Sequence, residues 1–184
     1  MRLFVAVNIP EDIKEKISDM QSRLKKALCD VNWAVADKFH LTLKFLGEVE
    51  EEVLPSASEC IAKSVSGFGK FRITFSGAGA FPCNEKPKVV WAGINEGKKE
   101  LERLAANIEN GLEKLGYKKE NRSYSAHLTL GRVRSFQNIS ALSKKIITLE
   151  GFESGGFTVE SADLMQSLLR PEGPEYKCLR SNSI

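Results

Sequence analysis

The two halves of the chain carry the same order of hydrophobic patterns. Residues 3–8 form a short apolar run, and apolar residues then recur at helical spacing over residues 13–28. Residues 90–95 form a second apolar run, which is followed by the same spacing over residues 101–115. Each half therefore predicts a strand and then an amphipathic helix with one buried face.

Each predicted helix is followed by the tetrapeptide His-Leu-Thr-Leu, which begins at His40 and again at His127, the only two histidines of the chain. Side chains of a strand alternate between its two faces, so each histidine shares a face with the following threonine, Thr42 or Thr129. The leucines of each motif point the other way. The pattern predicts two strands that each present an imidazole and a hydroxyl on one face, which packing alone does not explain.

The offset between the two motifs is 87 residues, from position 40 to position 127, and the same offset aligns the two apolar runs. This agreement indicates a tandem duplication, with repeats over about residues 1–84 and 88–170 of a single bilobal domain, 1–184. The polar segment 83–88 is the predicted junction. If the histidine strands lie side by side about a pseudo-twofold axis, both imidazoles and both hydroxyls face one shared cleft.

The rest of the pattern completes an α+β fold. Residues 50–65 and 140–147 predict further helices, residues 71–75 alternate as a strand, and residues 157–169 predict one strand or two. We expect two antiparallel sheets with helices on their outer faces and the cleft between the sheets. A doubly wound parallel sheet is disfavoured because no G-x-G-x-x-G phosphate loop follows the first strand.

Composition narrows the class of protein. The chain has 184 residues, of which 42% are hydrophobic and 28% charged, as is typical of a soluble globular protein. A net charge of +3 does not repel a phosphodiester and does not by itself indicate nucleic-acid binding. The four cysteines lack metal-ligand spacing, and Pro10 ends the first apolar run far short of the roughly 20 residues that span a membrane. We expect a reduced, cytoplasmic protein without a membrane segment.

Four runs of residues together resemble the 2'-5' RNA ligase family, also called RNA 2',3'-cyclic phosphodiesterase, within the two-histidine phosphoesterase superfamily. They are Arg-Leu-Phe-Val-Ala-Val at 2–7, His-Leu-Thr-Leu-Lys-Phe-Leu-Gly at 40–47, Ser-Ala-His-Leu-Thr-Leu-Gly-Arg at 125–132, and Gly-Pro-x-Tyr at 173–176. The resemblance covers nearly the whole chain in the correct order. Two departures are Ala126, where relatives often have proline, and a tail at 180–184 that lacks the expected apolar ending and leaves the last strand in question.

The resemblance implies opening of a 2',3'-cyclic phosphate at the end of an RNA, with the phosphate left on the 2' oxygen. It implies that His40 is the proton donor to the leaving oxygen and His127 the proton acceptor from water, an assignment that symmetry leaves open. Two imidazoles with ordinary pKa values near 6.5 can hold both roles at once, which predicts a bell-shaped pH profile. The hydroxyls of Thr42 and Thr129 can donate to the phosphoryl oxygens.

Phe45 and Arg132 lie at equivalent positions, five residues after each histidine. The resemblance implies that Arg132 contacts phosphate and that Phe45 stacks on a base. Strict alternation instead puts both on the leucine face, so they reach the cleft only if the strand bulges or ends, as Gly47 and Gly131 permit. Phe45 is therefore either a core residue or a stacking residue. Lys44 lies an even number of residues after His40, so strict alternation puts it on the cleft face. The alternative is a solvated lysine on the surface.

Other residues and activities stay open. Tyr124 and Trp33 are structural or flank a nucleobase. Two histidines without a third ligand make a poor zinc site, so no metal or cofactor is expected. The expected partner is RNA, as tRNA fragments or other 3' ends with a cyclic phosphate, and the expected state is a monomer. The alternatives are an esterase for a small cyclic phosphate or a 2'-5' oligonucleotide, and a noncatalytic module that binds RNA ends. Replacement of water by an RNA 5'-hydroxyl would give 2'-5' ligation without ATP.

Overall fold

The computed structural model describes residues 1–171 and 173–184, which form four α-helices, two short 3-10 helices and nine strands. Their order is β1 (Arg2–Asn8), α1 (Glu11–Lys25), β2 (Val31–Trp33), η1 (Ala36–Lys38), β3 (His40–Glu48), η2 (Glu51–Val53), α2 (Leu54–Val65), β4 (Phe71–Phe81), β5 (Val89–Ile94), α3 (Lys98–Glu113), β6 (His127–Val133), α4 (Ile139–Thr148), β7 (Glu153–Val159), β8 (Ser161–Arg170) and β9 (Gly173–Ser183).

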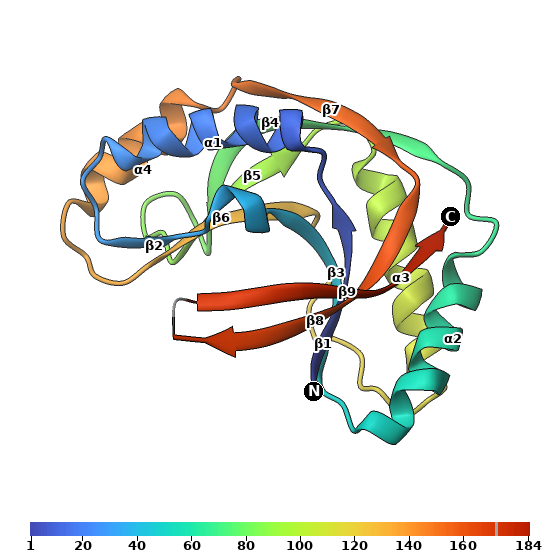
Figure 1. Ribbon diagram of the computed structural model, residues 1–184. Helices are drawn as coiled ribbons and strands as arrows, with labels where there is room; N and C mark the ends of the chain where they lie inside the picture. The colour runs from blue at the N-terminus through green and yellow to red at the C-terminus, as the bar shows by residue number, and fades with distance from the viewer. Residues whose placement is uncertain (172) are drawn as a thin grey trace.

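The strands form two sheets in which neighbouring strands are antiparallel (Figure 1). The first sheet has the order β3-β1-β8-β9, and the second has the order β2-β6-β5-β4-β7. Helices α2 and α3 pack against strands of the first sheet, whereas α1 and α4 pack against strands of the second. The expected α+β fold with two antiparallel sheets is confirmed.

The two sequence repeats do not coincide with the two sheets. Strand β4 lies in the first repeat but pairs with β5 of the second, and β8 lies in the second repeat but pairs with β1 of the first. The helices exchange in the same way, because α1 packs against β7 and α3 against β3. The hydrophobic pattern predicts each strand and helix but not the distant segment against which it packs. The exchange of strands and helices between the two repeats therefore could not be predicted from the sequence.

Strand β1 shows why its sequence is apolar without interruption. Leu3, Val5 and Val7 lie in the main core, and Phe4 and Ala6 lie in a second, smaller cluster on the opposite face. Both faces of β1 are therefore buried. The strand lies between β3 and β8, so its main-chain groups are also paired on both edges. A strand in this position has to be hydrophobic at successive positions rather than alternate ones.

One helix end differs from the prediction, and the structure decides two points that the sequence left open. Helix α1 ends at Lys25 rather than near Leu28, which has a positive φ of 52° and is exposed. Residues 157–169 belong to two strands, β7 and β8. The polar tail does form a last strand: the buried side chain of Asn182 donates to the Ala162 carbonyl oxygen at 3.0 Å, so a hydrogen bond takes the place of the apolar contact expected there.

Candidate active site

The two histidines begin β3 and β6 and are held in the same way. His40 Nδ1 lies 2.8 Å from the Lys38 carbonyl oxygen, and His127 Nδ1 lies 2.7 Å from the Ser125 carbonyl oxygen. A carbonyl can only accept, so each Nδ1 carries a hydrogen and donates it. Each neutral ring therefore has its lone pair on Nε2, the nitrogen that is left for chemistry. The equivalence of the two hydrogen bonds supports the duplication at the level of single atoms.

Aromatic rings surround both imidazoles. The His40 ring lies 4.9 Å from Phe4 and 5.0 Å from Tyr176, and the His127 ring lies 4.9 Å from Phe81, measured between centroids. Burial lowers the pKa of His40; the hydrogen bond to Lys38 opposes this shift, and the charge of Lys14 adds to it. Burial likewise lowers the pKa of His127, opposed by the hydrogen bond to Ser125 and assisted by the charge of Arg132.

Thr42 and Thr129 lie on the same strand faces as the histidines, as predicted. Both are half-buried, while the intervening Leu41 and Leu128 are buried in the core. Within the described part of the chain, neither threonine hydroxyl has a side-chain hydrogen bond. We call the face of β3 with His40 and Thr42, and the face of β6 with His127 and Thr129, the histidine faces.

A bulge in each histidine strand reverses the alternation at equivalent points. In β3, Val5 is opposite Lys44 and Ala6 is opposite Thr42, so Leu43 is the extra residue. In β6, Val90 is opposite Gly131 and Trp91 is opposite Thr129, which makes Leu130 the extra residue. The residues beyond each bulge change face.

The bulges bring Phe45 and Arg132 onto the histidine faces. The Phe45 side chain is 60% exposed and its ring lies 6.1 Å from that of Phe4, so it is not a core residue. Arg132 is exposed and lies opposite Asn32 of β2. Phe45 and Arg132 therefore reach the cleft because each strand bulges, which is one of the two conditions predicted from the sequence. The extra residues of the bulges precede Gly47 and Gly131 rather than coincide with them.

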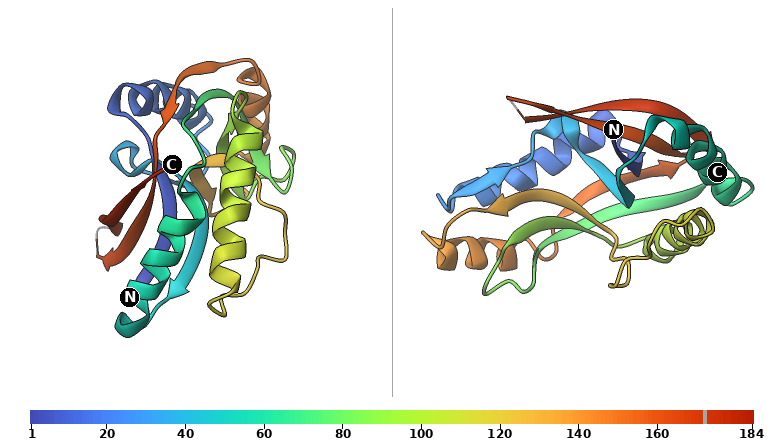
Figure 2. Two further views of the ribbon diagram at one scale, coloured as in Figure 1. Left: turned by 90° about the vertical axis from the view of Figure 1, so that its right-hand side faces the viewer. Right: turned by 90° about the horizontal axis from the view of Figure 1, so that it is seen from below.

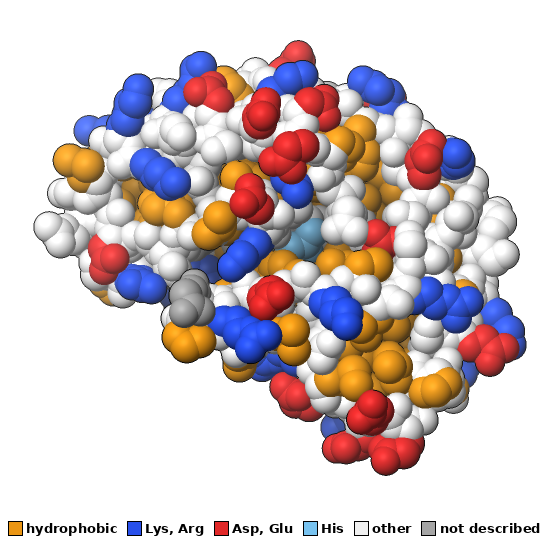
Figure 3. Space-filling view, viewed as in Figure 1, with side chains coloured by type: hydrophobic (Ala, Val, Ile, Leu, Met, Phe, Trp, Pro, Cys, Tyr) orange, Lys and Arg blue, Asp and Glu red, His pale blue; other side chains and the backbone are white. Residues whose placement is uncertain are grey.

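Arg132 also shows that the two sheets meet at this site. Its positive charge lowers the pKa of His127 on its own strand and opposes the burial that raises the pKa of Tyr176 on β9. The Tyr176 ring in turn contacts His40, and β3 and β6 contact each other directly. Figure 3 shows a histidine side chain in a hollow near the middle of one face, with Lys or Arg side chains beside it. Tyr176 therefore links His40 on the histidine face of β3 to Arg132 on the histidine face of β6.

Sequence reasoning missed the aromatic wall of this site. Phe4 and Trp91 occupy equivalent positions in the two repeats and lie beside the histidine faces, since they are paired in register with Phe45 and Thr129 respectively. The Trp91 ring covers Gly79 so closely that a Cβ there would lie 2.2 Å from it. The sequence feature that could have identified these two residues is an aromatic side chain at the same position of two otherwise aliphatic runs.

Lys44 is neither in the site nor solvated, which corrects both expectations. The bulge at Leu43 turns it to the helix side, where it is buried and its Nζ donates to Glu109 Oε1 at 2.8 Å and to the Lys118 carbonyl oxygen at 3.1 Å. Glu120 N–H donates to the same Glu109 oxygen at 2.8 Å. These contacts form a clamp that connects β3 to α3 and to the segment that leads into His127.

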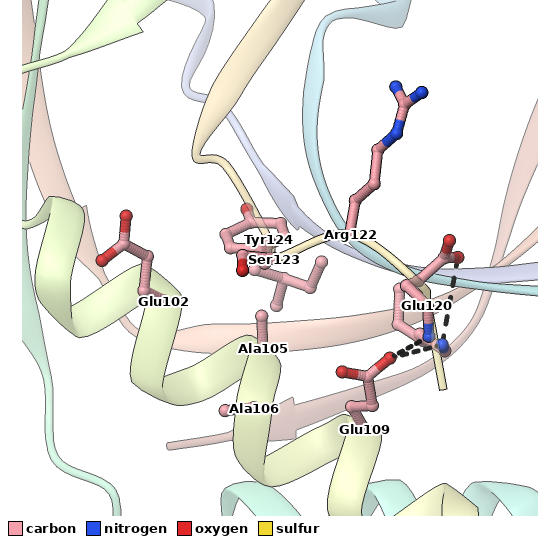
Figure 4. A pocket seen from close by; sticks show the side chains of 10 residues that line it. Glu102, Ala105, Ala106, Glu109, Glu120, Arg122, Ser123 and Tyr124 are labelled. Carbon is pink, nitrogen blue, oxygen red and sulfur yellow. Dashed lines mark hydrogen bonds and ion pairs between the residues drawn. The ribbon is translucent and has the colours of Figure 1, made fainter. Parts of the chain in front are cut away.

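A cavity of about 430 Å³ adjoins this clamp on the side away from the histidine faces (Figure 4). It is lined by residues of α3, by Leu43 and Lys44, and by Glu120 and residues 122–124. The Tyr124 hydroxyl is buried there without a hydrogen-bond partner in the described chain, and Trp33 packs against the main core, so neither residue flanks the histidines. The contacts therefore favour a structural role for Tyr124 and Trp33.

Replacement of Lys44 by methionine is expected to lower the free energy of unfolding by about 1–3 kcal/mol. Partial burial raises the pKa of Glu109, but the hydrogen bonds from Lys44 and from the Glu120 N–H, together with the charges of Lys44 and Lys119, lower it overall, so the substitution removes the main partner of this carboxylate. Glu109 keeps contact with water, being 26% exposed, which limits the loss. Urea unfolding measures the effect. Lys63→Met removes a fully exposed ion pair and should not change the midpoint; an equal effect of both substitutions would contradict the clamp.

Within the described residues, no group of three His, Cys, Asp or Glu side chains could hold a metal ion. No described helix is long and apolar enough to cross a membrane. The donors available at the site are thus two imidazoles, two hydroxyls, a phenol and a guanidinium, a set suited to an anionic phosphate.

Comparison with known proteins places this geometry in a family. The model of the LigT like Phosphoesterase family matches the chain twice, over residues 7–91 and 93–176, which are nearly the two repeats. The chain belongs to the LigT-like phosphoesterases. It is an enzyme of this family and a phosphoesterase, and the double match accounts for the duplicated motif.

Curated relatives extend over the whole chain. An RNA 2',3'-cyclic phosphodiesterase of Archaeoglobus fulgidus is 40% identical over 181 residues, which cover 98% of either chain. One from Methanothermobacter thermautotrophicus is 34% identical over 176 residues, covering 96% of this chain and 95% of the relative. Crystal structures of TT0787 of Thermus thermophilus and of E. coli LigT complexed with 3'-AMP superpose with TM-scores of 0.82 and 0.80 at 27% and 26% identity, each covering 100% of this chain and 97% of the other.

Proposed function

We propose that this LigT-like phosphoesterase hydrolyses 2',3'-cyclic phosphate ends of RNA to 2'-phosphate ends, with two histidines as acid and base and without a metal ion. The observation that carries the proposal is the matched pair of Nδ1 hydrogen bonds, 2.8 Å at His40 and 2.7 Å at His127, which reserves both Nε2 atoms for proton transfer. Relatives that cover the whole chain and are named RNA 2',3'-cyclic phosphodiesterase support the substrate class.

The reaction needs one proton removed and one supplied. Neutral His127 accepts a proton from water at Nε2 while the water oxygen bonds to phosphorus. The bond from phosphorus to the 3' oxygen breaks, and protonated His40 donates its Nε2 hydrogen to that oxygen. The products are a 2'-phosphate and a 3'-hydroxyl, and the proton count balances through the two imidazoles. An RNA 5'-hydroxyl in place of water would give a 2'-5' linkage, as between tRNA fragments, with no ATP.

The remaining groups bind the substrate. The hydroxyls of Thr42 and Thr129, one on each histidine face, are placed to donate to the nonbridging oxygens, and Arg132 supplies positive charge for the phosphate. Phe45 offers an exposed ring beside His40 for a base to stack on. The complex of E. coli LigT with 3'-AMP supports a nucleotide as ligand of this fold.

The test is turnover of a short RNA that ends in a 2',3'-cyclic phosphate, in the presence of EDTA, with the position of the product phosphate mapped. Release of a 2'-phosphate end supports the proposal. Formation of a 3'-phosphate would reverse the assignment of the leaving oxygen. Binding without turnover would support a recognition module, and turnover of only small cyclic phosphates or linear 2'-5' oligonucleotides would support those alternative esterases.

The pH dependence of kcat/KM is expected to be bell-shaped with its optimum below about pH 6.5, because burial lowers both histidine pKa values from that ordinary value. Activity falls at low pH as His127 becomes protonated and falls at high pH as His40 loses its proton. Bound phosphate adds negative charge between the rings, so the kcat profile should lie at higher pH than the kcat/KM profile. Initial rates from pH 4 to 9 measure both, and a flat profile would contradict the mechanism.

A further inference from the structure

The ladder between β2 and β6 continues past the last residue of β6. Arg134 N–H donates to the Asp30 carbonyl oxygen at 2.9 Å, one step beyond the pairing of Val133 with Val31. Residues two apart in a strand share a face, so Arg134 lies on the same face as Arg132. Both arginines are exposed. The histidine face of β6 therefore extends outward with a second arginine, Arg134, two residues after Arg132.

Two exposed apolar side chains lie at the end of this extension. Leu28, just before β2, is 78% exposed, and Phe136, just after β6, is 77% exposed. The loops that carry them are joined, because Asn138 Nδ2 donates to the Leu28 carbonyl oxygen at 2.9 Å. Leu28 and Asn138 have positive φ angles of 52° and 56°, a conformation that is uncommon for residues other than glycine. Each of the two joined loops therefore presents one exposed apolar side chain to solvent.

The position of this pair fits a continuation of the active site. The loop after β6 lies toward the same end of the molecule as the last residues of β8 and the first residues of β9 in Figure 1 and in the right-hand view of Figure 2. Phe136 is the fourth residue after Arg132, a distance of at most about 13 Å in an extended chain. That length matches about four stacked nucleotides, or fewer in an extended strand.

We infer that the RNA strand on the 5' side of the reacting end leaves the site along β6, with a phosphate on Arg134 and a base stacked on Phe136 beside Leu28. The inference rests on the proposed function and specifies its substrate as an oligonucleotide rather than a cyclic mononucleotide. Guanidinium groups spaced along a strand suit phosphates, and an exposed ring next to them suits a base of any sequence. A protein partner would have no need of the same spacing.

The experiment compares kcat/KM for substrates of one to six nucleotides that all end in a 2',3'-cyclic phosphate. In the native chain, kcat/KM should rise at least tenfold from one to four nucleotides and then stay constant for longer substrates. Phe136→Ala should remove most of this gain, by about tenfold on the tetranucleotide, and leave the mononucleotide within twofold. Arg134→Ala should weaken the longer substrates and lower the slope of log(kcat/KM) against log[salt] by about one.

Two control variants match these substitutions. Ile147→Ala removes an exposed apolar side chain on α4, and Lys63→Ala removes an exposed cation on α2; neither should alter the length dependence. Equal rates for all lengths, or a length dependence untouched by both test variants, would overturn the inference while leaving cyclic phosphate hydrolysis intact. A change of oligomeric state in Phe136→Ala without a change of length dependence would assign the patch to a second copy of the chain.

Failure of the proposed function has a different signature, which is no turnover at any length. In that case anisotropy of labelled RNAs of one to six nucleotides with 2'-phosphate ends tests the same surface. Affinity that rises with length in the native chain and not in Phe136→Ala would still support the RNA track. Affinity independent of length would overturn it.

Discussion

Substitution of either histidine by alanine is expected to lower kcat on an RNA 2',3'-cyclic phosphate by about 10²- to 10⁴-fold. On the proposed mechanism, each change removes the group that moves one of the two protons, and no other imidazole exists in the chain to replace it. Steady-state rates with a mononucleotide substrate measure the loss. Product inhibition by a nucleoside 2'-phosphate should persist in both variants, because the threonines and Arg132 remain.

The shape of the residual pH profile distinguishes the two roles. If His127 is the base, His127→Ala should lose the fall in activity at low pH, since that fall reports its protonation. If His40 is the acid, His40→Ala should lose the fall at high pH. Exchange of these two outcomes would reverse the assignment while preserving the mechanism. Full activity in either variant, with an unchanged melting temperature, would exclude two-histidine catalysis.

The site itself was readable from the sequence to a large extent, for a physical reason. A strand has an exact period of two, so the spacing of His40 and Thr42 fixes a shared face without knowledge of the fold. The same holds for His127 and Thr129. The repeated motif then predicts the same geometry for both faces. These residues lie as predicted, half-buried on the faces opposite the leucines.

The remaining features depend on contacts distant in sequence. The bulges at Leu43 and Leu130 are set by the pairing with β1 and β5, and no turn residue within the motifs signals them. They decide the faces of Lys44, Phe45 and Arg132, which is why simple alternation misplaced Lys44. The exchange of β4 and β8 between the sheets is equally nonlocal. The hydrophobic period of a segment predicts which of its residues are buried. Which other strand or helix buries them depends on the fold.

Replacement of Arg132 by alanine is expected to lower kcat/KM for a cyclic mononucleotide by about 10²- to 10³-fold, the second largest effect at this site. Arg132 is an exposed cation on the histidine faces, with its charge felt by both His127 and Tyr176. Arg132→Lys keeps the charge but loses the planar pair of donors, so it should recover only part of the loss. Arg134→Ala, the next arginine on the same face, serves as the matched control and should stay within twofold on this substrate.

The same substitution has a spectroscopic consequence with a definite sign. The Arg132 charge lowers the pKa of His127, so Arg132→Ala should raise that pKa toward its ordinary value. The low-pH limb of the rate profile should then move to higher pH, whereas the high-pH limb, which reports His40, should move less. Titration of the two imidazoles by NMR in the free protein measures this directly. A large loss of activity with no change in the pKa of His127 would place Arg132 out of reach of that imidazole, and an unchanged rate would remove Arg132 from the site.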